Sequence, residues 1–258
     1  ATWAGAGGTV TGTGRNVLVS DVYSDLTTID AGGAGQAGTI DIRGSNAIAI
    51  DASASLRADA NSASGNGGTV RVIAGDTLRG YGSLSARGGS AGGNGGTIET
   101  SAPHFELLGL RVDASAPMGT AGSWVIDPYD VTIAHGTASG SLTGNPFDPL
   151  ANSTVQDGDI NAALDGGTSV TITTGTGGNP AAGNITFAAG ASIVRSKGAA
   201  PLTFELDAAH SIGTSGGARI QSNSGALDVE FNAAEGGQGG AINYNGLINT
   251  HADNETDN

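Results

Sequence analysis

The stretch Gly92-Gly93-Asn94-Gly95-Gly96-Thr97-Ile98 decides the fold, because its ending recurs along the chain. In this stretch a glycine run leads into Thr and then into a β-branched residue. The Thr or Ser after the glycine recurs at positions 9, 39, 69, 97 and 123, in steps of 30, 30, 28 and 26 residues. Self-similarity at this period predicts a repeat architecture of stacked units.

A second motif keeps the same period and consists of an aliphatic residue, any residue, then Ala. Two features that share one period indicate stacked coils, and the small Ala is predicted to fill a crowded inner corner. The motif recurs in steps of 27, 28 and 28 residues at Ile29/Ala31, Leu56/Ala58, Leu84/Ala86 and Val112/Ala114.

Between these motifs, apolar and polar residues alternate with a period of two, as in TIDI at 39–42 and TVRV at 69–72. Such short runs, bounded by Gly, Asn, Ser or Asp, predict β-strands. Like residues one coil apart, such as Ile40, Val70 and Ile98, can stack only if the strands are parallel and about 4.8 Å apart. We therefore predict an all-β fold, a right-handed parallel β-helix (solenoid) of roughly seven to eight coils, its hand following from the usual parallel crossover.

The repeat and its interruption divide the chain into four parts. Residues 1–133 hold glycine-rich β-helix coils of about 28 residues. Residues 134–168 lose the pattern, which predicts a loop excursion with a short helix. Strand alternation returns over residues 169–250, which predicts further β-helix coils. The tail, residues 251–258, is polar and acidic and is predicted to be flexible.

Two details concern the interruption. Trp124 breaks the rule of small and aliphatic residues, so we predict a large plug where the cross-section of the coil changes. Within the excursion, residues 153–165 show the spacing of a helix that Ser153 or Thr154 could cap.

Composition and charge exclude several classes of protein. The chain has no Cys, so neither disulfides nor a thiolate zinc site can form. The net charge is −14: residues 1–112 carry nine acids and seven Arg (−2), and the remainder carries fifteen acids and three bases (−12). We expect no nucleic-acid partner, because such a chain repels polyanions. No apolar run reaches the roughly 18 residues of a membrane span. The start Ala1-Thr2-Trp3 lacks a signal peptide and suggests a mature product or an excised fragment.

The sequence of residues 92–133 is distinctive. It resembles the shaft of filamentous-haemagglutinin-like exoproteins of Gram-negative two-partner secretion. The matching motifs are Glu99-Thr100-Ser101, Val112–Pro117 and Trp124–Ile133, and the segment Asp159–Thr174 is also similar to the family. The resemblance covers most of the chain. It implies a right-handed β-helical rod that a partner outer-membrane transporter secretes to the cell surface or the medium.

The same resemblance implies a role in adhesion, biofilm formation or contact-dependent competition. The family's amino-terminal secretion domain and any carboxy-terminal toxin are not visible in the sequence, which suggests the shaft alone. Because neither end shows a cap, we also expect head-to-tail self-association into fibres. The host surface or glycan receptor is not specified by the sequence.

Three glycine motifs match the sequence patterns of known binding or catalytic sites. Residues 33–38 match G-x-G-x-x-G, but a strand rather than a helix follows, which favours a turn over a dinucleotide site. Residues 88–92 and 213–217 match G-x-S-x-G, a pattern expected by chance in a chain rich in Gly and Ser.

Candidate metal ligands are few. Asp127 and Asp130 flank Pro128 and could form part of a calcium site, although caps of a turn are favoured. The histidines lack the spacing of zinc ligands and are expected to be solvated or to cap turns. They are His104, His135, His210 and His251.

Paired acids offer an alternative function. LTFEL and LDVEF lie 25 residues apart and are predicted to occupy one position in successive coils, which could bring Glu205 and Asp207 next to Asp228 and Glu230. Neighbouring carboxylates of this kind serve polysaccharide hydrolases. The favoured interpretation is an exposed sheet face whose charges oppose aggregation.

These observations favour a non-catalytic structural shaft segment of a secreted cell-surface adhesin or filament. We expect no catalytic, cofactor-binding or metal-binding residues and no cofactor. The alternatives are a carbohydrate-active β-helix enzyme, either a polysaccharide lyase or a hydrolase, and a carbohydrate-binding rod without turnover.

Overall fold

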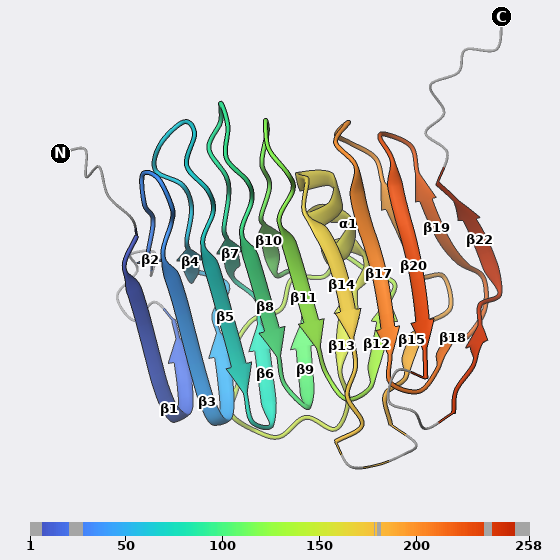
Figure 1. The fold of residues 1–258 in the computed structure, drawn as a ribbon. Helices are drawn as coiled ribbons and strands as arrows, with labels where there is room; N and C mark the ends of the chain where they lie inside the picture. Colours follow the sequence, from blue (N-terminus) through green and yellow to red (C-terminus); the bar gives the residue numbers. More distant parts are fainter. Residues whose placement is uncertain (1–6, 21–27, 178, 180–181, 235–238, 251–258) are drawn as a thin grey trace, which may run out of the picture.

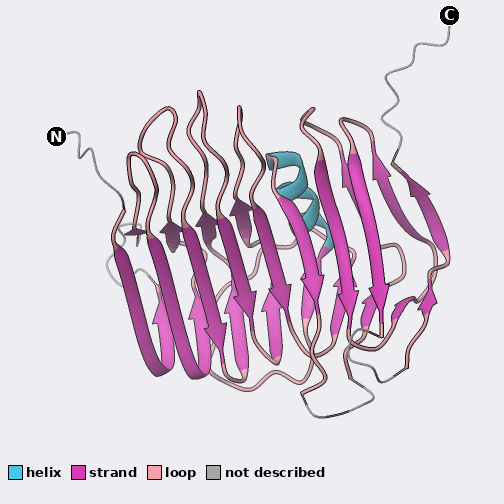
Figure 2. Cartoon of the chain, viewed as in Figure 1, coloured by secondary structure: helices cyan, strands magenta, loops and turns pink. Residues whose placement is uncertain are grey.

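The computed structural model is a parallel β-solenoid of about eight turns, with the first turn at one end and the last at the other (Figure 1). It describes residues 7–20, 28–177, 179, 182–234 and 239–250. The predicted tail and His251 lie outside the described residues. Strands dominate the described part, and one helix, α1, lies along one side (Figure 2). The predicted fold class is confirmed, and its right-handed winding stays a prediction.

Each turn contributes to three faces, which we call A, B and C. Face A is formed by the first strand of each turn, and in the first five turns this strand directly follows a glycine. Its strands are β1 (Thr9–Val19), β3 (Thr39–Ile50), β5 (Thr69–Ala74), β8 (Thr97–Ser101), β11 (Ser123–Asp127), β14 (Ser169–Thr173), β17 (Leu202–Ala208) and β20 (Leu227–Ala233).

Face B joins face A through β3, which pairs with β5 by its first half and with β6 by its second. The two faces therefore form one 15-stranded sheet. The remaining strands of face B, in spatial order, are β6 (Thr77–Gly80), β9 (His104–Leu107), β13 (Thr154–Gln156), β12 (Val131–Ala134), β15 (Ile185–Phe187), β18 (Ile212–Thr214) and β21 (Ile242–Asn243).

Face C consists of a four-stranded sheet and a three-stranded sheet, with helix α1 (Asp157–Gly166) in contact with β10 and β16 between them. The helix thus takes the place of one strand. The first sheet contains β2 (Thr28–Asp30), β4 (Ser55–Arg57), β7 (Ser83–Ser85) and β10 (Arg111–Asp113), and the second contains β16 (Ser192–Arg195), β19 (Ala218–Ser222) and β22 (Gly246–Asn249).

The predicted stacking register is confirmed. On face A, Ile40 pairs with Val70, and Val70 pairs with Ile98. On face C, Leu56 pairs with Leu84, and Leu84 pairs with Val112. Because these side chains point inward, they form columns in which each of the six is buried. Burial of one such aliphatic side chain stabilises the fold by about 1.5–3 kcal/mol.

The two sequence motifs meet at the corner where one turn passes into the next. The carbonyl oxygen of each motif Ala accepts a hydrogen bond from the N–H of the Gly that precedes the motif Thr or Ser. All four Ala are buried, which confirms the predicted crowded corner. The N···O distances are 2.7 Å for Gly38–Ala31, 2.8 Å for Gly68–Ala58, 2.7 Å for Gly96–Ala86 and 2.8 Å for Gly122–Ala114.

Trp124 lies in the face A column between Ile98 and Val170 and is fully buried. Its Nε1 donates a hydrogen bond to Thr100 Oγ1 at 3.0 Å, so the one polar atom of the indole is satisfied inside the core. The prediction of a large buried side chain at this turn is confirmed. It is also the turn in which the helix replaces a strand on face C.

That turn places two strands out of sequence order. Strand β13 comes after β12 in the chain, yet it lies between β9 and β12 and pairs with both. The connection from β12 to β13, residues 135–153, contains neither helix nor strand. This is the stretch in which the sequence pattern is lost, and its length allows the chain to return and insert β13.

Helix α1 begins at Asp157, and the prediction of a start near residue 153 is wrong. Thr154 belongs to β13, and Ser153 Oγ accepts a hydrogen bond from Phe105 N at 3.2 Å. Neither residue caps the helix. The N-cap is Gln156, whose side chain makes no capping hydrogen bond. Pairing with the sheet therefore overrides the local signal for a helix start.

Candidate functional site

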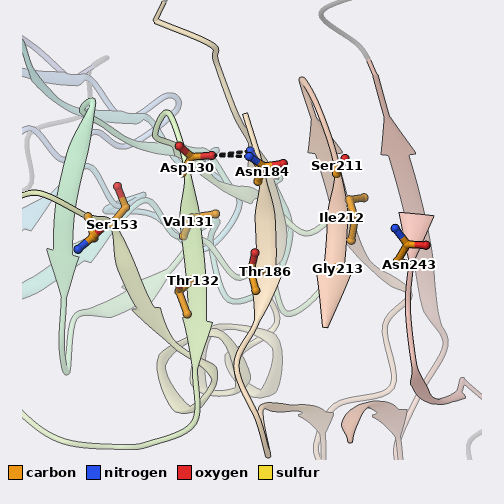
Figure 3. A pocket seen from close by; sticks show the side chains of 11 residues that line it. Asp130, Val131, Thr132, Ser153, Asn184, Thr186, Ser211, Ile212, Gly213 and Asn243 are labelled. Carbon is orange, nitrogen blue, oxygen red and sulfur yellow. Dashed lines mark hydrogen bonds between the residues drawn. The ribbon is translucent and has the colours of Figure 1, made fainter. Parts of the chain in front are cut away.

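A polar groove lies on the outer side of face B, where β12, β15 and β18 are side by side (Figure 3). Ile133 and Phe187 point into the core, so the alternate side chains point outward. The cavity measures about 440 Å³. Its polar lining includes Asp130, Thr132, Asn184, Thr186, Ser211 and Asn243.

Asp130 organises one end of this groove. Its Oδ1 accepts hydrogen bonds from the backbone N–H of Gly183 at 3.1 Å and of Asn184 at 2.9 Å, and from Asn184 Nδ2 at 2.9 Å. Asn184 Oδ1 in turn lies 2.9 Å from His210 Nδ1. Asp130 therefore holds the backbone that leads into β15, a segment far from it in the sequence, whereas the interpretation favoured from the sequence is a cap of the turn at Pro128.

Asp127 has a different neighbourhood and does not act together with Asp130. Its Oδ2 accepts a hydrogen bond from Ser101 Oγ at 3.1 Å, and burial raises its pKa above the usual value. Among the described residues, no three or more His, Cys, Asp or Glu side chains gather in a way that could hold a metal ion. The calcium interpretation of the two aspartates thus gains no support from their geometry.

The start of helix α1 carries buried acids that anchor the excursion. Asp157 Oδ1 accepts a hydrogen bond from Gly136 N at 2.9 Å, and its Oδ2 lies 2.8 Å from His135 Nδ1. Gln156 exchanges two hydrogen bonds of 2.7 Å with the backbone of Ala138. The first residues of the connection between β12 and β13 are therefore held by side chains at the end of β13 and the start of α1.

Asp159, also buried, joins the helix to the loop before β10. It accepts hydrogen bonds from Gly109 N at 2.8 Å, Arg111 Nη1 at 2.9 Å and Gln156 Nε2 at 3.2 Å. Burial raises the pKa of Asp159, against these hydrogen bonds and the charge of Arg111, which lower it. Each carboxylate oxygen has a partner, so this acid has a structural role.

The other side of α1 completes the edge of β16. Asn161 Oδ1 accepts a hydrogen bond from Val194 N at 2.7 Å, and its Nδ2 donates to Ser192 O at 2.9 Å. Asp157 Oδ2 accepts from Ser192 N at 2.8 Å. Asp165 Oδ1 accepts from the N–H groups of residues 196 and 197. Residues 157, 161 and 165 share one helix face because they are four residues apart. Their side chains thus supply the hydrogen bonds that a strand would make.

The predicted pairing of acids is correct for one pair only. Glu205 lies opposite Glu230 on β17 and β20, whereas Asp207 lies opposite Asn232 and Asp228 opposite Thr203. Partial burial raises the pKa of Glu205, and the charges of Asp207 and Glu230 raise it further, against a hydrogen bond from Thr171. One carboxylate pair, in which the pKa of Glu205 is elevated, is thus present on face A.

The glycine motif at residues 33–38 lies in a turn, as predicted. It leads into strand β3. Residues 213–214 end strand β18, and residues 215–217 lead into strand β19. Residues 88–92 form a turn that the bridge between Gly89 and Gly92 closes. No helix follows any of the three, so none presents the free N–H groups of a helix start to a phosphate or an oxyanion.

The histidines are spread over the rod. His104 packs edge-on against Tyr129 with a centroid distance of 6.4 Å, His135 contacts Asp157, and His210 contacts Asn184. The structure brings none of these three together with another.

Sequence reasoning missed three outward arginines on face C, Arg57, Arg87 and Arg111. The sequence shows that each arginine is next to an inward residue of a Φ-x-Ala motif, and so points outward, but it does not show that the three share a groove. In a strand, neighbours of an inward residue point outward.

No family model matches this chain, and no curated protein matches it either. Among the described residues, no helix has the length and apolar character of a membrane span. The functional argument therefore depends on the fold and on the side chains it presents.

Proposed function

We propose that this chain is a non-catalytic structural shaft segment of a secreted cell-surface adhesin or filament, which mediates attachment, biofilm formation or cell–cell contact. The observation that carries the proposal is the continuous apolar column under face A. It passes from Ile40 through Trp124 to Phe204 with each member fully buried. A column of this kind stiffens a rod along its axis, because every turn is held by the turns on either side.

The motifs shared with filamentous-haemagglutinin-like exoproteins add support for the setting. In this proposal the chain belongs to a Gram-negative bacterium. A partner outer-membrane transporter exports the chain in unfolded form, and the rod forms outside the cell. Absence of Cys suits such export, since no disulfide has to form after passage. Stacking of each turn on the previous one also lets folding proceed in the direction of emergence.

The test is surface display. The chain is fused behind a two-partner secretion domain, with its transporter, in a non-adherent Gram-negative host. We expect rods on the surface by electron microscopy, and more attachment and cell–cell aggregation than with the secretion domain alone. The matched control is the same fusion carrying Ile98→Asp, which should lose both rods and attachment. Display of intact rods without any gain in attachment or aggregation contradicts the proposal.

The carbohydrate-active enzyme remains the second candidate, and the pair Glu205 and Glu230 is the observation that favours it. Purified protein is incubated with acidic and neutral polysaccharides, and reducing ends and unsaturated products are measured. The shaft proposal expects no product. Product that disappears in Glu230→Gln but persists in Asp228→Asn establishes an enzyme instead, because only residue 230 lies opposite Glu205.

A further inference from the structure

An arginine-lined groove runs along face C over strands β4, β7 and β10, which lie at the rear of the view in Figure 1. It consists of two open cavities of about 480 and 390 Å³. Both are lined by Arg57, Arg87 and Asp113, so they are two parts of one groove. The second part extends to helix α1, where Ala162 forms its wall.

The stack places these arginines on three successive rungs of face C, at different positions along the strands. Arg57 lies on β4 opposite Ser85 of β7, and Ser83 of β7 lies opposite Arg111 of β10. Arg87 lies two residues after the end of β7. The three side chains therefore rise from successive rungs in a staggered row. The rungs are about 4.8 Å apart along the rod, and along the strand direction Arg57 is offset by two residues from Arg87 on one side and from Arg111 on the other. Their side chains are 41%, 47% and 57% exposed, in the order Arg57, Arg87 and Arg111.

Buried acids orient the arginines and use only some of their N–H donors. Asp59, 5% exposed, accepts from Arg87 Nε at 3.1 Å and Nη2 at 2.8 Å, and lies 3.5 Å from Arg57 Nε. Asp159, 1% exposed, accepts from Arg111 Nη1 at 2.9 Å. A guanidinium carries five N–H donors. The two aspartates thus orient the guanidinium groups and leave donors for a ligand.

The exposed charge of the groove is positive although the chain is acidic. Asp59, which also lines the groove, and Asp159 are nearly buried, whereas Asp113 is 41% exposed. The chain as a whole carries −14. An anion is therefore attracted to this groove and repelled by much of the remaining surface.

The other polar groups narrow the class of ligand. Ser55, Ser83 and Ser85 line the groove between the arginines. Their hydroxyls both donate and accept, and Asp113 accepts only, so they suit a ligand rich in hydroxyl groups. Asp113 opposes a densely charged polymer, because a like charge would lie against it. Carboxylates spaced along a polyhydroxylated chain fit both requirements, and each can pair with a guanidinium through two parallel hydrogen bonds.

We propose that this groove binds an extended acidic oligosaccharide, in which uronate carboxylates contact Arg57, Arg87 and Arg111 while sugar hydroxyls contact the serines and Asp113. This inference goes beyond the shaft proposal and does not rest on it, since a rod could lack the site and a soluble protein could have it.

The test is calorimetric titration of the purified chain with an oligogalacturonate and with its methyl ester, which has the same backbone without the charges. We expect binding of the acid form, weakened by salt, and no binding of the ester. Arg57→Gln should weaken binding about 10-fold, the value of one charged hydrogen bond. Arg57→Lys should be intermediate, because it keeps the charge and loses the planar fork.

The matched control is Arg71→Gln on face A. Arg71 is 47% exposed and pairs with Glu99 at 2.9 Å. The variant Arg71→Gln therefore loses an equivalent charge outside the groove. Its affinity should stay within about twofold of the unaltered chain. Arg57 is the main variant because its one ion pair is long, and thermal melting verifies that it is folded. Four outcomes overturn the proposal: no binding of the acid form, equal binding of the ester, an equal loss in Arg71→Gln, or equal affinity for polyglutamate.

Discussion

A Cβ atom on Gly96 would lie 1.9 Å from the carbonyl oxygen of Gly68, one turn earlier in the solenoid. The same contact recurs at 2.0 Å between Gly68 and Gly38 and at 2.1 Å between Gly122 and Gly96. Real Cβ atoms do not approach backbone oxygen so closely. The glycine before each motif Thr is therefore required by stacking itself. Because its N–H also bonds the Ala carbonyl of the Φ-x-Ala motif, one corner explains both sequence repeats.

Replacing Gly96 by Ala should therefore force two turns apart. We expect a loss of about 2 kcal/mol or more in the free energy of unfolding, the range of overpacked sites. Urea unfolding followed by circular dichroism measures it. The control is Gly35→Ala, where a Cβ would meet nothing within 4 Å, and which should cost little. Equal stabilities of the two variants would show that the turns can separate freely at this corner.

A charge in the face A column should destabilise the fold more than Gly96→Ala does. Ile98 is fully buried between Val70 and Trp124, so Ile98→Asp leaves a carboxylate without a partner in an apolar environment. We expect loss of the cooperative transition or a decrease of more than about 4 kcal/mol in stability. Thr97→Asp, on the exposed side of the same strand, is the control. Unchanged melting of Ile98→Asp would contradict the stacking register.

The column could be predicted from sequence because each turn repeats the same residue types at one period. The turn that begins with β11 could not, for two physical reasons. Strand β13 has only three residues, and its place between β9 and β12 depends on pairing with strands far away in sequence. Helix α1 replaces a strand through polar side chains, which leave no mark on a pattern of apolar residues.

The candidate sites were less predictable than the fold. The match of Glu205 with Glu230 followed from the 25-residue step, whereas the contacts of Asp130 with residues 183 and 184 had no local signal. The arginine groove did not, because Arg57, Arg87 and Arg111 occupy different positions within their repeats. Only the three-dimensional stack places their side chains on adjacent rungs of one face.

The substitution of a strand by α1 leads to a specific prediction for Asn161. Its side chain satisfies both Val194 N and Ser192 O, so Asn161→Ala should leave the edge of β16 without these partners. We expect a loss of about 1–3 kcal/mol. Hydrogen exchange should show faster exchange of the Val194 amide while Ile98 on face A stays protected. Ala162→Ser, at an exposed position of the same helix, is the control. An unchanged Val194 rate would mean that the helix does not act as a strand.

The ends of the described solenoid lead to a prediction about self-association. Strands β1 and β20 each pair with a strand on one side only, among the residues described. Ile242, Leu247 and Ile248 in the last turn are about half exposed. Unpaired edges of this kind accept further strands. We propose that copies stack head to tail, so the mass found by sedimentation should rise with concentration. Ile248→Lys should shift the chain toward monomer, and a monomer at every concentration without this change would contradict the proposal.

The carboxylate pair on face A should make stability depend on pH. The pKa of Glu205 is raised above its ordinary 4.5 by partial burial and by the nearby charges of Asp207 and Glu230. The folded state therefore holds the proton more tightly than the unfolded state. The favourable contribution of protonated Glu205 to the free energy of unfolding is therefore fully present below pH 4.5, and it is lost as the pH rises through the folded-state pKa.

Glu205→Gln removes this penalty, so the variant should exceed the unaltered chain in stability at neutral pH by about 0.5 kcal/mol, the value for like charges on opposed strands. The difference should vanish well below pH 4.5. Thermal melting at both pH values measures it. Asp228→Asn, which neutralises an acid that lies opposite Thr203 rather than a carboxylate, is the control. If Glu205→Gln remained more stable than the unaltered chain at low pH, the effect would be due to packing. At that pH a protonated glutamate and a glutamine are both uncharged.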